Sequence, residues 1–64
     1  MKYESFSVGN KIRIIKGFKL GASGFIIENG NIAEVIEIPE NLLLLKAKVA
    51  GVEFYIHKDR VEKI

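Results

Sequence analysis

The chain has 64 residues, of which 48% are hydrophobic and 28% charged, with no cysteine and a formal net charge of +2. This length and composition predict one small globular domain over residues 1–64, and the lack of cysteine excludes disulfides, thiolate metal sites and cysteine nucleophiles. The N-terminus lacks the apolar core of a signal peptide, and the longest apolar run, Leu42–Leu45, is too short to span a bilayer. We therefore expect a cytoplasmic protein that does not enter membranes.

Charge is distributed unevenly along the chain. Residues 1–27 carry five basic and one acidic side chain (+4), residues 28–41 carry four glutamates and no basic residue (−4), and residues 42–64 carry five basic and three acidic residues (+2). A basic pole can bind phosphate and an acidic pole can bind a basic partner, although mixed charge also serves solubility.

The first half of the chain reads as two strands. Polar and apolar residues alternate over Lys11–Ile14, which predicts a strand that buries Ile12 and Ile14. A loop containing glycines follows over Gly17–Gly24. After it, the apolar run Phe25–Glu28 predicts a second strand.

The Asn-Gly pair within Asn29–Asn31 is a strong hairpin signal and predicts a turn after the second strand. The β-branched stretch Ile32–Ile38 predicts a third strand, which Pro39 ends. Leu42–Val49 could form a short helix by composition, but turn signals on both sides favour a fourth strand.

The alternating stretch Val52–His57 predicts a fifth strand. The tail Lys58–Ile64 has room for one 3₁₀ turn, with Val61 and Ile64 spaced to lie together. Five short strands in so small a chain leave long unpaired edges unless the sheet closes. The predicted fold is therefore all-β, an SH3-like five-stranded barrel with a short C-terminal 3₁₀ turn.

The segment from Val8 to Glu28 resembles the KOW motif of ribosomal proteins and NusG-type transcription elongation factors. In that motif a glycine opens the first strand, apolar residues alternate along it, and a glycine-rich loop leads to the second strand. The matching positions are Gly9, Ile12, Ile14, Gly17, Gly21, Gly24 and Phe25–Ile27. Leu20 stands where the family's loop usually carries a lysine, with Lys19 one position earlier. The resemblance implies an SH3-like barrel that contacts RNA or a transcription or translation complex.

Catalytic signatures are missing from the sequence. His57 has no second histidine and only Asp59 nearby as a metal ligand, so we expect neither a metal nor a cofactor. The serines lie in no nucleophile-elbow context. One enzyme alternative remains, because Val52–Tyr55 is similar to a strand of the SH3-like plasmid dihydrofolate reductases, although Glu53 replaces their glutamine. We predict a non-enzymatic binding module.

Basic and aromatic side chains provide the first candidate surface. If the first and fifth strands are neighbours, outward cations on one lie beside Tyr55 on the other, and Phe18 extends this pattern in the glycine loop. Cations neutralise phosphate and aromatic rings stack on unpaired bases. The alternative is that Phe18 folds back over the barrel mouth, that Tyr55 covers a sheet edge, and that the cations are solvated. The candidate nucleic-acid contacts are Lys11, Arg13, Lys16, Phe18, Lys19, Tyr55 and His57.

An apolar patch provides the second candidate surface. If Lys46 and Lys48 point outward, alternation places Leu42 and Leu44 outside as well. Leu43 and Leu45 then point inside. The alternative is a bulge or helical turn that buries all of Leu42–Leu45. An exposed patch would suit a homodimer, a protein-interaction adaptor or a small regulatory subunit. The candidate interface residues are Ile36, Ile38, Leu42 and Leu44.

Overall fold

The computed structural model of the chain describes residues 5–21 and 24–64. Lys2 and Glu4 of the charge count, and Ser23 in the glycine loop, lie outside the described residues. The strands are β1 (Lys11–Ile14), β2 (Phe18–Leu20), β3 (Phe25–Ile27), β4 (Ile32–Glu37), β5 (Leu44–Val49), β6 (Val52–His57) and β7 (Val61–Lys63), with a 3₁₀ turn, η2 (Lys58–Arg60), before β7. The predicted all-β class and the C-terminal 3₁₀ turn are confirmed. Across the described ranges, no helix is long and apolar enough to cross a membrane.

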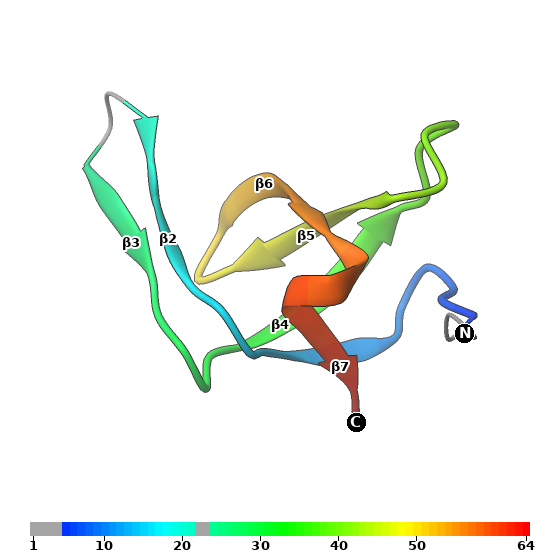
Figure 1. The fold of residues 1–64 in the computed structure, drawn as a ribbon, viewed down its shortest axis with the longest axis horizontal. Helices are drawn as coiled ribbons and strands as arrows, with labels where there is room; N and C mark the ends of the chain where they lie inside the picture. Colours follow the sequence, from blue (N-terminus) through cyan, green and yellow to red (C-terminus); the bar gives the residue numbers. More distant parts are fainter. Residues whose placement is uncertain (1–4, 22–23) are drawn as a thin grey trace.

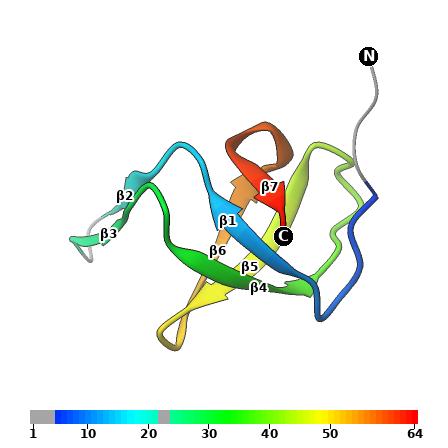
Figure 2. The same ribbon diagram turned by 90° about the horizontal axis from the view of Figure 1, so that it is seen from below.

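The strands form two antiparallel sheets (Figures 1 and 2). Five strands follow the order β6-β5-β4-β1-β7, and β2 pairs with β3 in a separate hairpin. The hairpin extends from the end of the β1–β4 pair, where Gly30 N–H donates to the Ile14 carbonyl (2.7 Å) and Ile14 N–H donates to the Asn31 carbonyl (2.8 Å). The side chain of Asn29 accepts a bond from Gly17 N–H (2.6 Å) across the base of the hairpin.

One face of the five-stranded sheet supplies most of the core. Alternation along β1 buries Ile12 and Ile14, as the sequence predicted, and alternation along β6 buries Phe54 and Ile56. The full set of buried side chains is Ile12, Ile14, Ile27, Ala33, Val35, Leu45, Ala47, Phe54, Ile56 and Val61. Half-buried residues of the hairpin, Phe18, Leu20 and Phe25, pack against this core.

The segment expected to be a glycine loop contains a strand. Phe18 pairs with Ile27 and Leu20 pairs with Phe25, while Lys19 between them is exposed. The apolar side chains on either side of Lys19 pack against the core, and their burial stabilises an extended conformation. Three residues between glycines are too few to predict this strand from the sequence. The loop prediction is therefore wrong for β2.

The C-terminal tail continues beyond its 3₁₀ turn into strand β7. Val61 is buried, whereas Ile64 is 63% exposed, so the two do not lie together as expected. Strand β7 pairs with β1, and β6 lies at the opposite edge of the sheet. The first and last strands are neighbours, but the last strand is Val61–Lys63 and not Val52–His57.

Strand β5 begins later than predicted. The side chain of Asn41 accepts a bond from Leu43 N–H (2.9 Å), and its carbonyl accepts one from Leu44 N–H (3.1 Å). This turn interrupts the alternation, so Leu43 is 51% exposed instead of buried. A helical turn that buries all four leucines is also wrong, because Leu42 is 76% exposed. The register irregularity lies instead on β4, between Val35 and Glu37.

Candidate functional site

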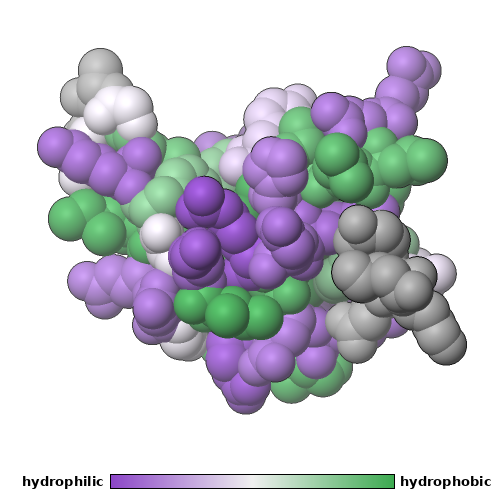
Figure 3. All heavy atoms as spheres, viewed as in Figure 1, coloured by the Kyte–Doolittle hydropathy of each residue, from purple (hydrophilic) through white to green (hydrophobic). Residues whose placement is uncertain are grey.

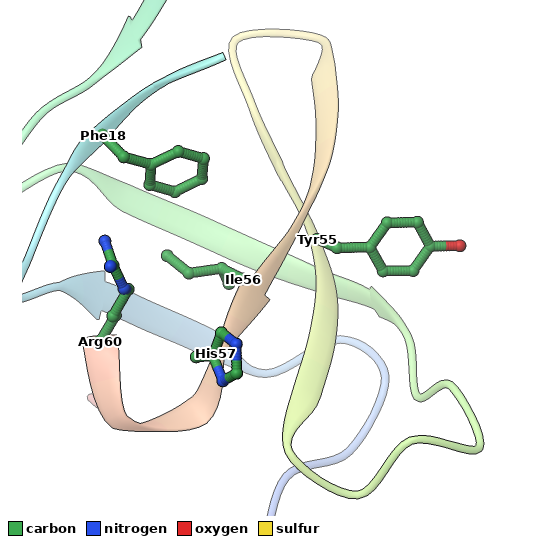
Figure 4. Close-up of a pocket in the computed structure, with 5 residues that line it drawn as sticks. All are labelled: Phe18, Tyr55, Ile56, His57 and Arg60. Atoms are coloured by element: carbon green, nitrogen blue, oxygen red, sulfur yellow. The ribbon is translucent and has the colours of Figure 1, made fainter. Parts of the chain in front are cut away.

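A cavity of about 220 Å³ opens between the hairpin, strand β6 and the 3₁₀ turn (Figure 4). Phe18 of β2 and Arg60 of η2 line two sides of the cavity, and residues of β6 line the third. In Figure 4, Phe18, Ile56 and Arg60 converge on one side of β6, and the ring of Tyr55 points to the other side. The lining residues are Phe18, Tyr55, Ile56, His57 and Arg60.

The ring of Phe18 is held by the core. It meets the ring of Phe54 edge to face, with centroids 5.9 Å apart and planes inclined by 74°. This geometry is favourable for two aromatic rings and holds Phe18 against the core. Phe18 is half-buried in this position, and it also lines the cavity.

Arg60 places a cation on the same ring. Its guanidinium carbon lies 5.9 Å from the centre of Phe18, within the range of cation–π attraction. The Arg60 carbonyl accepts bonds from Ile15 N–H (2.7 Å) and Lys16 N–H (3.2 Å), which join the 3₁₀ turn to the chain leading into the hairpin. Among residues 5–21 and 24–64, no carboxylate forms an ion pair with Arg60. Among the described residues, the positive charge on the cavity wall therefore has no paired carboxylate.

The other predicted contacts near Phe18 are divided between two faces. Lys16 is exposed where the chain runs beside the Arg60 carbonyl. His57 is exposed and lines the cavity. Lys19 lies on the opposite face of the hairpin from Phe18, because neighbouring residues of a strand alternate. The structure thus brings Phe18 and His57 to one cavity with Arg60, and Lys16 approaches the cavity through its backbone bond to Arg60.

A second aromatic ring, that of Phe6 near the N-terminus, lies beside two cations from the C-terminal part of the chain. The ammonium groups of Lys58 and Lys63 lie 6.0 Å and 5.9 Å from the centre of the Phe6 ring. Lys58 belongs to the same 3₁₀ turn as Arg60. The turn and the strand that follows it therefore carry basic residues that the sequence analysis left outside the candidate set.

Tyr55 belongs to a different surface, the outer face of β5 and β6. Lys46 lies opposite Tyr55 in the sheet, and its ammonium is 5.6 Å from the ring centre. It also lies 3.7 Å from a carboxylate oxygen of Glu37 and 3.5 Å from one of Glu53. Tyr55 first, then Glu53 and Glu37, hold the pKa of Lys46 above its ordinary value of 10.5.

The predicted neighbourhood of Arg13 and Tyr55 is wrong, because β5 and β4 separate β6 from β1. Arg13 instead lies opposite Glu62 of β7 and forms an ion pair with it at 2.5 Å. Lys11, on the same strand, lies opposite Glu34 of β4. Both predicted cations of β1 therefore face acidic residues and lie on a different strand from the cavity.

Apolar surface gathers around the connection between β4 and β5, at the upper right of Figure 3. Ile38 is 40% exposed in this connection, next to the exposed pair Leu42 and Leu43. Ile36 and Leu44, which were expected on the same patch, are half-buried. We call Ile38, Leu42 and Leu43 the apolar tip.

The residue that sequence reasoning missed is Arg60. The sequence did hold an indication of it, since a basic residue in a short turn after the last long strand can lie beside the end of the sheet. A 3₁₀ turn of three residues is too short, however, to predict from sequence which way each side chain points. In the part of the chain that the structure describes, no group of three or more histidine, aspartate or glutamate side chains could hold a metal ion. Comparisons with protein-family models, curated proteins and solved structures find no match to this chain.

Proposed function

We propose that this chain is a non-catalytic binding module that holds single-stranded RNA at the cavity between β2, β6 and η2. The observation that carries this proposal is the guanidinium of Arg60 against the ring of Phe18, at 5.9 Å, with no carboxylate paired to it among the described residues. A cation with no paired carboxylate in the described part of the chain is available to an anionic ligand.

Aromatic and cationic groups together suit unpaired nucleotides. Every base has a π face that can stack on an aromatic ring or a guanidinium plane, and phosphates bind arginine and lysine. Phe18 and Arg60 supply the stacking surface, and Lys16, whose backbone N–H bonds the Arg60 carbonyl, supplies a further charge for the RNA backbone. Paired bases would not be able to reach a half-buried ring, which is why we propose single-stranded RNA and not a duplex.

The architecture supports the same family of functions. We propose that the two sheets form an SH3-like barrel of the KOW type, within a cytoplasmic transcription or translation complex. Three features favour this: β1 and β7 are neighbours, a 3₁₀ turn precedes the last strand, and the motif glycines Gly9, Gly21 and Gly24 have positive φ angles of 95°, 31° and 75°. Positive φ is a conformation that glycine adopts readily and other residues rarely do.

The test compares two arginines. Fluorescence anisotropy with a labelled single-stranded RNA should show binding at low salt, and Arg60→Gln should weaken it roughly tenfold, as one charge-assisted contact of about 1.5 kcal/mol is lost. Arg13→Gln is the matched control, because Arg13 is exposed but already paired with Glu62. Equal losses for both variants, or no binding at low salt, would contradict the proposal.

A protein-interaction module is the second candidate, favoured by the exposure of Leu42 (76%) and Leu43 (51%) in the apolar tip. Large apolar side chains that adjoin one another on a surface often mark a protein interface. Binding through the apolar tip would persist at high salt, whereas RNA binding would weaken. Leu42→Ser should abolish the first and leave the second unchanged.

A further inference from the structure

Strand β6 is an unprotected edge of the five-stranded sheet. Its outer side pairs with no other strand in the ranges that the structure describes, and its register with β5 is unbroken from one end to the other. Natural edge strands are usually kept from pairing with other chains by shortness, proline, a bulge or several charges, above all lysine. Strand β6 is six residues long, contains no proline or bulge, and carries one formally charged side chain, that of Glu53. The other edge, β7, has three residues, of which two are charged.

The hydrogen-bonding groups that β6 presents to this open side follow from its turn. Ala50 and Gly51 have φ angles of 51° and 82°, as in a two-residue hairpin turn, and the residues flanking such a turn form a hydrogen-bonded pair. Alternate residues of β6 therefore bond to β5, and Lys58 continues the series by donating to the Leu43 carbonyl at 2.9 Å. The remaining residues direct their N–H and C=O groups to the open edge; they are Glu53, Tyr55 and His57.

These three residues are complementary to themselves. If a second copy of β6 lies antiparallel with the two-fold axis at Tyr55, each Tyr55 faces the other, and each Glu53 faces His57 of the second copy. Each residue that directs its backbone groups to the open edge then lies opposite another such residue of the second copy. Each of these facing pairs can therefore exchange two N–H···O=C hydrogen bonds. Moving the register by two residues in either direction takes one of the three beyond the strand. The central register also places the carboxylate of Glu53 beside an imidazole, which can donate a hydrogen bond to it.

We propose that this chain forms a two-fold symmetric dimer in which the β6 strands pair antiparallel about Tyr55, so that one sheet runs through both copies. The dimer interface comprises the backbone of β6 and the side chains of its outer face, and two of its residues, Tyr55 and His57, also line the cavity.

The decisive measurement is amide hydrogen exchange on the wild-type chain at increasing concentration, beside sedimentation analysis of its mass. Tyr55 N–H has no bonding partner within the described chain, and it gains one in the dimer, so its exchange should slow as the mass doubles. A chain that stays monomeric at millimolar concentration overturns the proposal. So does a dimer in which the exchange of Tyr55 and His57 amides does not change, since that dimer uses another surface.

A charge-swap series tests the register. His57→Glu places two carboxylates opposite each other in both symmetry-related pairs, which should raise the dimer dissociation constant roughly tenfold. Adding Glu53→Lys to that variant restores opposite charges and should restore the affinity. Val8→Glu adds one negative charge on another exposed residue, 63% accessible, and should leave the dimer unchanged. Failure of the double variant to recover, with each chain still folded by circular dichroism, would overturn the register about Tyr55.

Discussion

Gly17 passes so close to Ile27 that a Cβ atom on Gly17 would lie 2.0 Å from the Ile27 carbonyl oxygen. No side chain fits at this distance from a backbone atom, so the contact explains why the chain has glycine where β1 leads into the hairpin. The side chain of Asn29 holds the same place by accepting a bond from Gly17 N–H. We expect Gly17→Ala to lower the free energy of unfolding by at least about 2 kcal/mol, because the hairpin must move away from the β1–β4 pair. Urea denaturation measures this, and an unchanged midpoint would contradict the contact.

Gly24 should be sensitive for a different reason. Its φ angle is +75°, but a Cβ atom there would meet nothing within 4 Å, so the cost of substitution is conformational and not steric. Gly24→Val should lower the stability by about 1–3 kcal/mol. Gly24→Asn is the matched variant, because asparagine tolerates positive φ, and it should lose clearly less. Equal losses in thermal denaturation would show that φ is not the cause.

Period-two alternation predicted the buried faces of the long strands. Successive side chains of an extended strand point to opposite faces, so every second residue faces the core and is apolar. It failed where the chain leaves that geometry. Leu43 is exposed because the Asn41 turn interrupts the alternation before β5 begins. Strands of three residues, such as β2 and β7, are too short to show a period, and they form because Phe18 and Val61 find places against the core.

The candidate site was predictable only in part for the same reason. Phe18 and His57 were identified from residue type, and the structure places both at the cavity, whereas Lys16 approaches it only through its backbone bond to Arg60. The prediction that Arg13 lies beside Tyr55 assumed that Val52–His57 is the strand next to β1. That neighbour is a long-range property, and it is decided by whether the last seven residues form a further strand. Because they do, Glu62 takes the place expected for Tyr55.

Leu45 of β5 and Leu42 of the β4–β5 connection should differ sharply in their effect on stability. Leu45 is fully buried, so Leu45→Ala should cost about 2–5 kcal/mol through lost burial and the cavity left behind. Leu42 is 76% exposed, and Leu42→Ala should stay within about 0.5 kcal/mol of the wild type. Chemical denaturation of both variants checks this. A large loss for Leu42→Ala would mean that Leu42 is covered in solution.

Alkaline pH should weaken the outer face of β5 and β6. The pKa of Lys46 is raised above 10.5 by Tyr55, Glu53 and Glu37, so its stabilising attraction is fully present below that pH and is lost as the pH rises through the folded-state value. We expect the melting temperature to fall at high pH, and to fall less steeply in Lys46→Met, where the charge is absent. Melting curves from neutral pH to about pH 11 measure the difference. Parallel curves for the two chains would show that Lys46 is not coupled to these groups.

The salt dependence of RNA binding should separate the roles of Phe18 and Arg60. A surface of this size can reach about three phosphates, which predicts a slope of roughly −2 for log K against log salt, at about −0.7 for each single-strand contact. Arg60→Gln should flatten the slope by about 0.7, because one phosphate contact is removed. Phe18→Leu keeps an apolar side chain against Phe54 but removes the stacking surface, so it should weaken binding by about 1–3 kcal/mol with the slope unchanged.

Tyr55→Leu is the aromatic control, since that ring lies on the other side of β6 and already faces Lys46. Anisotropy across a salt series, on variants shown to keep the wild-type melting temperature, gives all four slopes. A Tyr55→Leu loss equal to that of Phe18→Leu would place the RNA on the outer face of β6 and would remove the cavity from the proposal.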